Sequence, residues 1–158
     1  MNIDASLDIL FALIISFVFT FATTPLVRRL AFKIGAVDVP KDNRRMHKKP
    51  TPLIGGLAIV FGFMVSTICF AFLYCDKREL LGTLLGAAII VIMGVVDDCK
   101  ALPAVPKFIV QIIAAFVVVF VGGIKIAVFT NPNIFSENPY WVLPEWFSVT
   151  VTVLWIVF

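Results

Sequence analysis

The chain has 158 residues, of which 61% are hydrophobic and 15% are charged, and its formal net charge is +3. A soluble domain of this size has too much surface for its volume to hide so many apolar side chains, so a soluble globular protein and a disordered tail are effectively excluded. Three cysteines and one histidine also exclude a disulfide framework and a multi-histidine zinc site.

Five uncharged apolar runs, taken in chain order, predict an all-α polytopic membrane protein. A helix needs about 20 apolar residues to cross a bilayer. Four runs, over residues 9–27, 53–75, 80–96 and 108–124, reach about that length, and a fifth, over 146–158, is cut off by the end of the chain. The polar alternation of a membrane barrel is absent. We therefore predict a transmembrane bundle of four complete helices and a truncated fifth, within one domain that takes in residues 1–158.

The distribution of basic residues predicts the orientation of these helices. Eight of the thirteen Lys and Arg residues lie within residues 28–52, and two more lie within residues 97–107. The positive-inside rule places both segments in the cytoplasm, and it places the N-terminus, residues 76–79 and residues 125–145 outside. Three aromatic residues suit a belt at the outer interface: Tyr140, Trp141 and Trp146.

The loop before the second helix combines features that suit a polyanion. Its basic residues and lone histidine are followed by the rigid Pro50-Thr51-Pro52 and then by Gly55-Gly56. Glycine lets another group approach the backbone closely, and the N–H groups of a helix N-terminus attract phosphate. The alternative is that positive-inside topology alone accounts for most of these cations. The residues predicted to bind a phosphorylated substrate here are Arg44, Arg45, His47, Lys48, Lys49, Gly55 and Gly56.

Two adjacent acids, Asp97 and Asp98, end the third apolar run on the same membrane face. Acids are locally unfavourable at the negative end of a helix, and ionisable groups at membrane depth are often functional. Without a His or Cys cluster, a carboxylate site suits Mg²⁺, with Mn²⁺ as the alternative. The competing interpretation is a solvated acid pair neutralised by Lys100. Lys107, at the start of the fourth run, either binds a phosphate or snorkels at the interface.

Together these motifs resemble a family of membrane enzymes. In order and spacing they are similar to the polyprenyl-phosphate N-acetylhexosamine-1-phosphate transferases. The likeness is greatest to the undecaprenyl-phosphate N-acetylglucosamine-1-phosphate transferase branch, which starts teichoic acid or related cell-envelope polymers. The segment from Asp38 to His47 is one residue longer than the commonest form of the family. The resemblance rests on Asp38-x-Pro40, Asn43-Arg44-Arg45-x-His47, Pro52-x-x-Gly55-Gly56, Gly94-x-x-Asp97-Asp98 and Pro106-Lys107-x-x-x-Gln111.

The resemblance implies an active site on the cytoplasmic face of the cell membrane, with Mg²⁺, a UDP-N-acetylhexosamine donor and an undecaprenyl phosphate acceptor. It implies no nucleic-acid partner, and it leaves a homodimer open. In the family, the acids matching Asp97 and Asp98 are active-site residues tied to the metal and the acceptor phosphate, and the loop matching residues 47–56 borders the site. Further catalytic acids follow the position of Phe158. We therefore expect the chain to be the N-terminal part of such an enzyme and to be inactive alone.

The implied reaction transfers a sugar phosphate to a lipid phosphate and releases UMP. Two other interpretations remain: a transport or channel component with Asp97 and Asp98 on an ion path, and a non-catalytic membrane fragment. No charged residue lies in the middle of any complete apolar run, which counts against an ion path.

Overall fold

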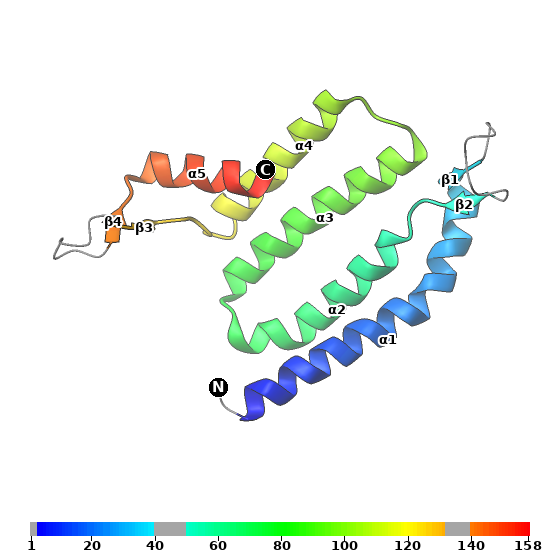
Figure 1. Ribbon diagram of the computed structural model, residues 1–158, viewed down its shortest axis with the longest axis horizontal. Helices are drawn as coiled ribbons and strands as arrows, with labels where there is room; N and C mark the ends of the chain where they lie inside the picture. Colours follow the sequence, from blue (N-terminus) through cyan, green and yellow to red (C-terminus); the bar gives the residue numbers. More distant parts are fainter. Residues whose placement is uncertain (1–2, 40–49, 132–139) are drawn as a thin grey trace. The chain divides into compact units, whose positions relative to one another are not determined.

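The structure is a computed structural model that describes residues 3–39, 50–131 and 140–158. Within these ranges it contains five helices and two short hairpins (Figure 1). Three helices are long and apolar enough to cross a membrane, and the other two are shorter but also apolar. The predicted all-α membrane class is confirmed, whereas neither hairpin was predicted. The elements are α1 (Ile3–Ile34), β1 (Val37–Asp38), β2 (Thr51–Pro52), α2 (Gly56–Tyr74), α3 (Lys77–Cys99), α4 (Ala104–Phe120), β3 (Val128–Thr130), β4 (Tyr140–Val142) and α5 (Glu145–Val157).

Several helices extend beyond the apolar runs that predict them. Helix α1 continues past Val27 to Ile34, so that Arg28 lies on the helix and not in a loop. Helix α3 likewise ends at Cys99, after the two acids. An apolar run marks only the part of a helix that meets lipid, and Arg and Lys are good helix formers that carry the helix onward into water. Figure 1 also shows α1 bending along its length, as expected for a helix with an internal proline, Pro25.

The chain divides into two compact units, which we describe separately. The first contains the described residues up to Asp76 together with Val91–Pro103, and the second contains Lys77–Ile90 and Ala104–Phe158. Helix α3 therefore contributes its C-terminal half to the first unit and its N-terminal half to the second.

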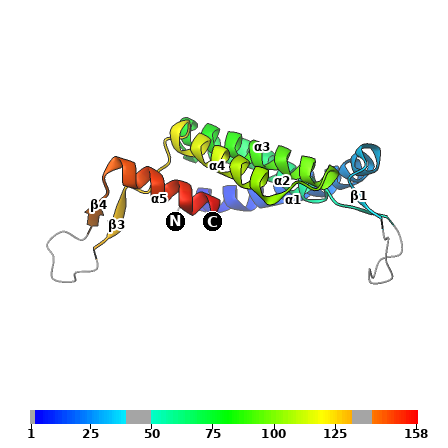
Figure 2. The ribbon, with the colours of Figure 1, turned by 90° about the horizontal axis from the view of Figure 1, so that it is seen from above.

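In the first unit, α1 and α2 lie side by side, as both views show (Figures 1 and 2). Gly62 allows the close approach, because a Cβ at this position would overlap the Thr20 hydroxyl and lie 2.5 Å from the Ser16 carbonyl oxygen. Ser66 is 7% exposed, and its hydroxyl donates a hydrogen bond to the Ala12 carbonyl at 2.7 Å. Small residues and interhelical hydrogen bonds are the usual means of helix association in lipid.

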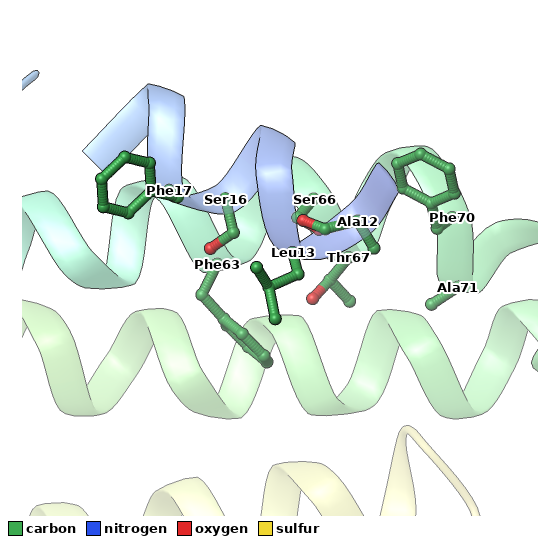
Figure 3. Close-up of a pocket in the computed structure, with 9 residues that line it drawn as sticks. All are labelled: Ala12, Leu13, Ser16, Phe17, Phe63, Ser66, Thr67, Phe70 and Ala71. Atoms are coloured by element: carbon green, nitrogen blue, oxygen red, sulfur yellow. The ribbon is translucent and has the colours of Figure 1, made fainter. Parts of the chain in front are cut away.

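A groove of about 590 Å³ runs beside this seam. Figure 3 shows hydroxyl-bearing side chains, Ser16, Ser66 and Thr67, lying among the rings of Phe17 and Phe63. The α1–α2 seam is therefore not uniformly apolar, although Ser66 at least has its polar atom paired.

A small core fixes the opposite end of the first unit. Helix α1 ends at Gly35, whose positive φ of 80° lets the Ala36 N–H bond back to the Ala31 carbonyl at 3.0 Å. Strands β1 and β2 then pair in antiparallel fashion, and the ladder is continued by a bond from Leu53 N–H to the Ala36 carbonyl at 3.0 Å. Ile54, 2% exposed, packs with both alanines and with Val95 of α3. This core holds the end of α3 beside the connection from β2 to α2.

In the second unit, α3 packs against α4 through glycines. A Cβ on Gly82 would overlap the backbone of Gly122, and one on Gly86 would lie 2.5 Å from a methyl group of Val118. The Arg78 guanidinium donates hydrogen bonds to the Val121 carbonyl at 2.9 Å and to the adjacent carbonyl at 3.1 Å. This cation caps the C-terminal end of α4, where the helix dipole favours positive charge.

The chain after Gly123 runs in an extended conformation against α5. The Ser148 hydroxyl donates to the Ile126 carbonyl at 2.6 Å, and the Ile126 N–H donates to the Thr152 hydroxyl at 2.8 Å. Both hydroxyl-bearing residues are buried. Because lipid offers no hydrogen bonds, extended backbone near the membrane must be paired in this way.

Candidate functional site

A hollow of about 220 Å³ lies in the first unit where α3 ends and α2 begins. Its walls come from the β2–α2 connection and the first turns of α2 on one side, and from the last turns of α3 on the other. Asp98 supplies its one charged side chain, and every other residue in its lining is aliphatic or glycine. The lining residues are Leu53, Ile54, Gly56, Leu57, Val60, Val91, Gly94, Val95 and Asp98.

Asp98 reaches this hollow because of its position in α3. It follows Gly94 by four residues, so the two lie on the same face of the helix, one turn apart. Val95, on the turn before, packs into the core around Ile54 and so fixes the rotation of the helix. Among the described residues, none forms a hydrogen bond or ion pair with the Asp98 carboxylate. The carboxylate therefore lines the hollow without a partner among the described residues.

Asp97 has a different environment from its neighbour. Its Oδ1 atom accepts a hydrogen bond at 2.9 Å from the backbone N–H of Leu102, which follows the end of α3. The bond is partly buried, and a carboxylate that accepts an N–H in this way fixes the path of the chain as it leaves the helix. The two acids thus have different environments: Asp97 accepts a backbone hydrogen bond, and Asp98 faces the hollow.

Glycines leave the walls of the hollow open. A Cβ added at Gly55, Gly56 or Gly94 would meet no atom within 4 Å, so these glycines are not required by packing. Gly56 is the first residue of α2, and the N-terminal end of a helix carries partial positive charge. The hollow therefore has a feature that favours an anion on one wall and a carboxylate that favours a cation on the other.

The other predicted site residues are placed less completely. Arg44, Arg45, His47, Lys48 and Lys49 lie outside the described residues, so their predicted role stays a prediction. Both flanks of that basic segment are described: β1 leads into it and β2 follows it, and the two strands pair. The residue after β2, Leu53, lines the same hollow as Asp98.

Lys107 belongs to the second unit, where it lies half-buried in the first turn of α4. Its predicted proximity to the acids stays a prediction.

The donor set for a metal can be tested on the described part of the chain. No group of three or more His, Cys, Asp or Glu side chains gathers there. The described residues therefore do not surround a metal ion with protein ligands alone. The adjacent carboxylates of Asp97 and Asp98 at the end of α3 are donors of the kind that Mg²⁺ uses, since this ion is usually bound by one or two carboxylates and completes its shell with water and substrate phosphates.

Sequence reasoning missed two features of the site. The aliphatic walls of the hollow, such as Val60 and Val91, are hidden in uniformly apolar runs, and no periodic signal separates them from lipid-facing residues. The bond from the Leu102 N–H to the Asp97 carboxylate was also missed. The signal for it was an acid near the end of a helix, because such side chains often accept a hydrogen bond from the backbone that follows.

Comparison with known proteins gives a family match and several relatives. Residues 80–158 match the family model described as glycosyl transferase family 4. The chain is 37% identical over 154 residues to the Bacillus subtilis protein named "Probable undecaprenyl-phosphate N-acetylglucosaminyl 1-phosphate transferase", a match that covers 98% of this chain and 41% of the relative.

Two further relatives are similar over shorter stretches. A Mycobacterium tuberculosis protein named "Decaprenyl-phosphate N-acetylglucosaminephosphotransferase" is 39% identical over 110 residues, covering 65% of this chain and 26% of the relative. A Yersinia pestis protein named "Undecaprenyl-phosphate alpha-N-acetylglucosaminyl 1-phosphate transferase" is 31% identical over 114 residues, covering 71% of this chain and 30% of the relative. The chain thus spans less than half the length of each of these relatives. No solved structure matches it.

Proposed function

Because the chain belongs to glycosyl transferase family 4, we propose that it is part of an integral-membrane enzyme that transfers N-acetylglucosamine-1-phosphate to undecaprenyl phosphate. The donor is a UDP-sugar and the other product is UMP, in the first membrane step of a cell-envelope polymer such as teichoic acid. The observation that carries the proposal is the hollow at the end of α3, where Asp98 faces the opening glycine of α2.

The chemistry of this transfer requires charge neutralisation more than a strong general base. A phosphate oxygen of the acceptor attacks the diphosphate of the donor, and both molecules are anions. The second pKa of a phosphate monoester is near 6, so the acceptor is mostly ionised at neutral pH and a strong general base is not needed. The main requirement is to neutralise and align two negatively charged groups.

In this proposal the acidic residues hold the metal ion, and the basic residues and the start of α2 hold the phosphates. Asp98 and Asp97 bind Mg²⁺, which when present offsets the negative charge of the phosphates. The start of α2 at Gly56 and the basic residues Arg44 to Lys49 bind phosphate oxygens. Asp97 also holds the chain after α3 through Leu102, which keeps both carboxylates at the end of the helix.

The membrane supplies the acceptor. The isoprenoid tail lies in the bilayer, so the site has to meet lipid at a membrane face, and the presence of helices long enough to span the membrane supports this proposal. The excess of Lys and Arg in residues 28–52 supports a cytoplasmic location for that face, on the side where nucleotide sugars are available.

The 158 residues form only part of this active site in our proposal, because they span 41% of the Bacillus subtilis relative. The test is a chimera in which this chain replaces the matching segment of that relative. Membranes from a host without its own enzyme receive UDP-[¹⁴C]N-acetylglucosamine and undecaprenyl phosphate.

We expect Mg²⁺-dependent label in the lipid fraction from the chimera and none from the 158-residue chain alone. A chimera that inserts normally but transfers no label would contradict the proposed function. Label produced by the chain alone would show that the chain is a sufficient enzyme and that the partial-site proposal is wrong.

A further inference from the structure

The hairpin β3–β4 exposes an apolar and aromatic surface outside the helices. Trp141 is 57% exposed and Val142 is 80% exposed, although hairpins that face water normally carry polar side chains on their open faces. All six side chains of the two strands are exposed, in the cross-strand pairs Val128 with Val142, Phe129 with Trp141, and Thr130 with Tyr140.

This surface is fixed to the start of α5. The Leu143 N–H donates to the Ala127 carbonyl at 2.9 Å, which continues the hairpin ladder towards the helix. Beyond it, the buried hydroxyl of Ser148 holds the Ile126 carbonyl. Figure 2 shows the hairpin directly beyond the N-terminal end of α5. The depth of the hairpin is therefore tied to the depth of α5.

The residues around the hairpin show which environment it occupies. Lys125 and Glu145 form an ion pair of 2.8 Å at its base, and both side chains are substantially exposed, as expected in contact with water. Trp146, in the first turn of α5, is 72% exposed. Charged groups beside exposed aromatic and aliphatic ones match the boundary between headgroups and acyl chains, where Tyr and Trp place a ring in lipid and a polar atom near water.

We propose that β3–β4 is an interfacial anchor that binds the bilayer surface at the level where α5 begins. The Phe129–Trp141 pair inserts among the lipid headgroups and upper acyl chains, the Val128–Val142 pair lies on the opposite face of the hairpin, and the Lys125–Glu145 pair remains on the aqueous side. The hairpin thereby sets the depth of α5 in the membrane. This inference does not depend on the transfer reaction.

Depth-dependent fluorescence quenching tests the anchor. The chain has three tryptophans. The double variant Trp146→Phe and Trp155→Phe leaves Trp141 as the only tryptophan, and the variant Trp141→Phe and Trp146→Phe leaves Trp155 as the only tryptophan of a matched control. Trp155 lies nine residues beyond Trp146 along α5, about 14 Å further at 1.5 Å per residue. Both are reconstituted in phosphatidylcholine vesicles with bromines near the headgroup or near the chain end, and acrylamide serves as the aqueous quencher.

For the Trp141 variant we expect blue-shifted emission and stronger quenching by bromines near the headgroup than by bromines near the chain end. The Trp155 variant should show the opposite preference. Strong quenching of Trp141 by acrylamide with none by brominated lipid would overturn the proposal, because the hairpin would then stand in water. Protection from all three quenchers would also overturn it, because protein would then cover the hairpin.

A less invasive measurement covers the case in which a double variant does not reconstitute. The single variant Trp141→Phe is compared with the unmodified chain in the same vesicles. The fluorescence that the unmodified chain shows and the Trp141→Phe variant lacks should be the part that is quenched by bromines near the headgroup. Loss of an acrylamide-sensitive component instead would refute the anchor.

Discussion

Replacing Gly62 by alanine tests the packing of α1 on α2. Alanine is favoured over glycine in a helix interior by about 1 kcal/mol, so propensity alone predicts stabilisation. The structure predicts the reverse, because the new methyl group would overlap the Thr20 hydroxyl and lie 2.5 Å from the Ser16 carbonyl oxygen.

The size of the effect follows from that geometry. A carbon atom needs about 3.3 Å to sit comfortably against a carbonyl oxygen, so the helices must separate by about 0.8 Å. A gap of about 0.5–1 Å forfeits a quarter to a half of each dispersion contact along the seam. Overpacking costs about 1–3 kcal/mol, and a clash with backbone lies at the upper end, which leaves a net loss of about 2 kcal/mol after the propensity gain.

The assay is unfolding in mixed micelles by increasing SDS, followed by far-ultraviolet circular dichroism. Gly94→Ala is the matched control, because Gly94 is also a helical glycine but an added Cβ there meets no atom within 4 Å. It should be neutral or more stable by up to about 1 kcal/mol. A Gly62→Ala chain at least as stable as the unmodified one would refute the packing described for α1 and α2.

Three further predictions concern the second unit and the topology. Ser148→Ala removes the hydroxyl that holds the Ile126 carbonyl and should lower stability to SDS by about 1 kcal/mol, whereas an unchanged midpoint would count against that buried bond. Arg78→Met keeps the aliphatic stem but removes the cap at the end of α4, and should raise amide hydrogen exchange in the last turn of that helix; equal exchange would contradict the cap. In whole cells, and with the three free native cysteines replaced by alanine, Asp76→Cys should react with an impermeant maleimide and Val39→Cys should not, and the opposite pattern would reverse the topology.

The sequence predicted the helices well because a bilayer imposes their length. Runs such as 53–75 have to be helices if they cross about 30 Å of lipid, whatever packs against them. The ends of the helices were predicted less well. Hydropathy falls where the chain leaves the membrane, but the backbone hydrogen bonds of the helix can continue beyond that point. Helix α1 therefore continues through Arg28 to Ile34 without an apolar signal.

The two hairpins had no comparable signal. Strands β1 and β2 have two residues each and are separated by a long basic segment, so no alternation can develop. Strands β3 and β4 are three residues each, and the aromatic character of Tyr140 and Trp141 indicated an interface but not a ladder. Such short pairs form because tertiary bonds, such as Ile126 to Thr152, fix their ends.

The sequence predicted the acidic and glycine residues of the site, but not the aliphatic residues that line the hollow. The motifs identified the family correctly, and the structure brings two of the predicted residues, Asp98 and Gly56, to one hollow. The roles of these residues stay predictions. The different environments of Asp97 and Asp98 were not predictable, since adjacent acids look equivalent until the rotation of α3 is set by Val95 against Ile54.

The most direct test of the account is the initial rate of N-acetylglucosamine-1-phosphate transfer by the chimera after Asp98→Asn, which removes the charge facing the hollow and nearly keeps the shape. Asp76→Asn, at an exposed acid in the α2–α3 connection, is the matched control. We predict that Asp98→Asn lowers the rate by about 100-fold or more at normal membrane levels, whereas Asp76→Asn leaves it unchanged. A rate near that of the unmodified chimera with Asp98→Asn, at the same Mg²⁺ dependence, would contradict the assignment of this hollow as the reaction site.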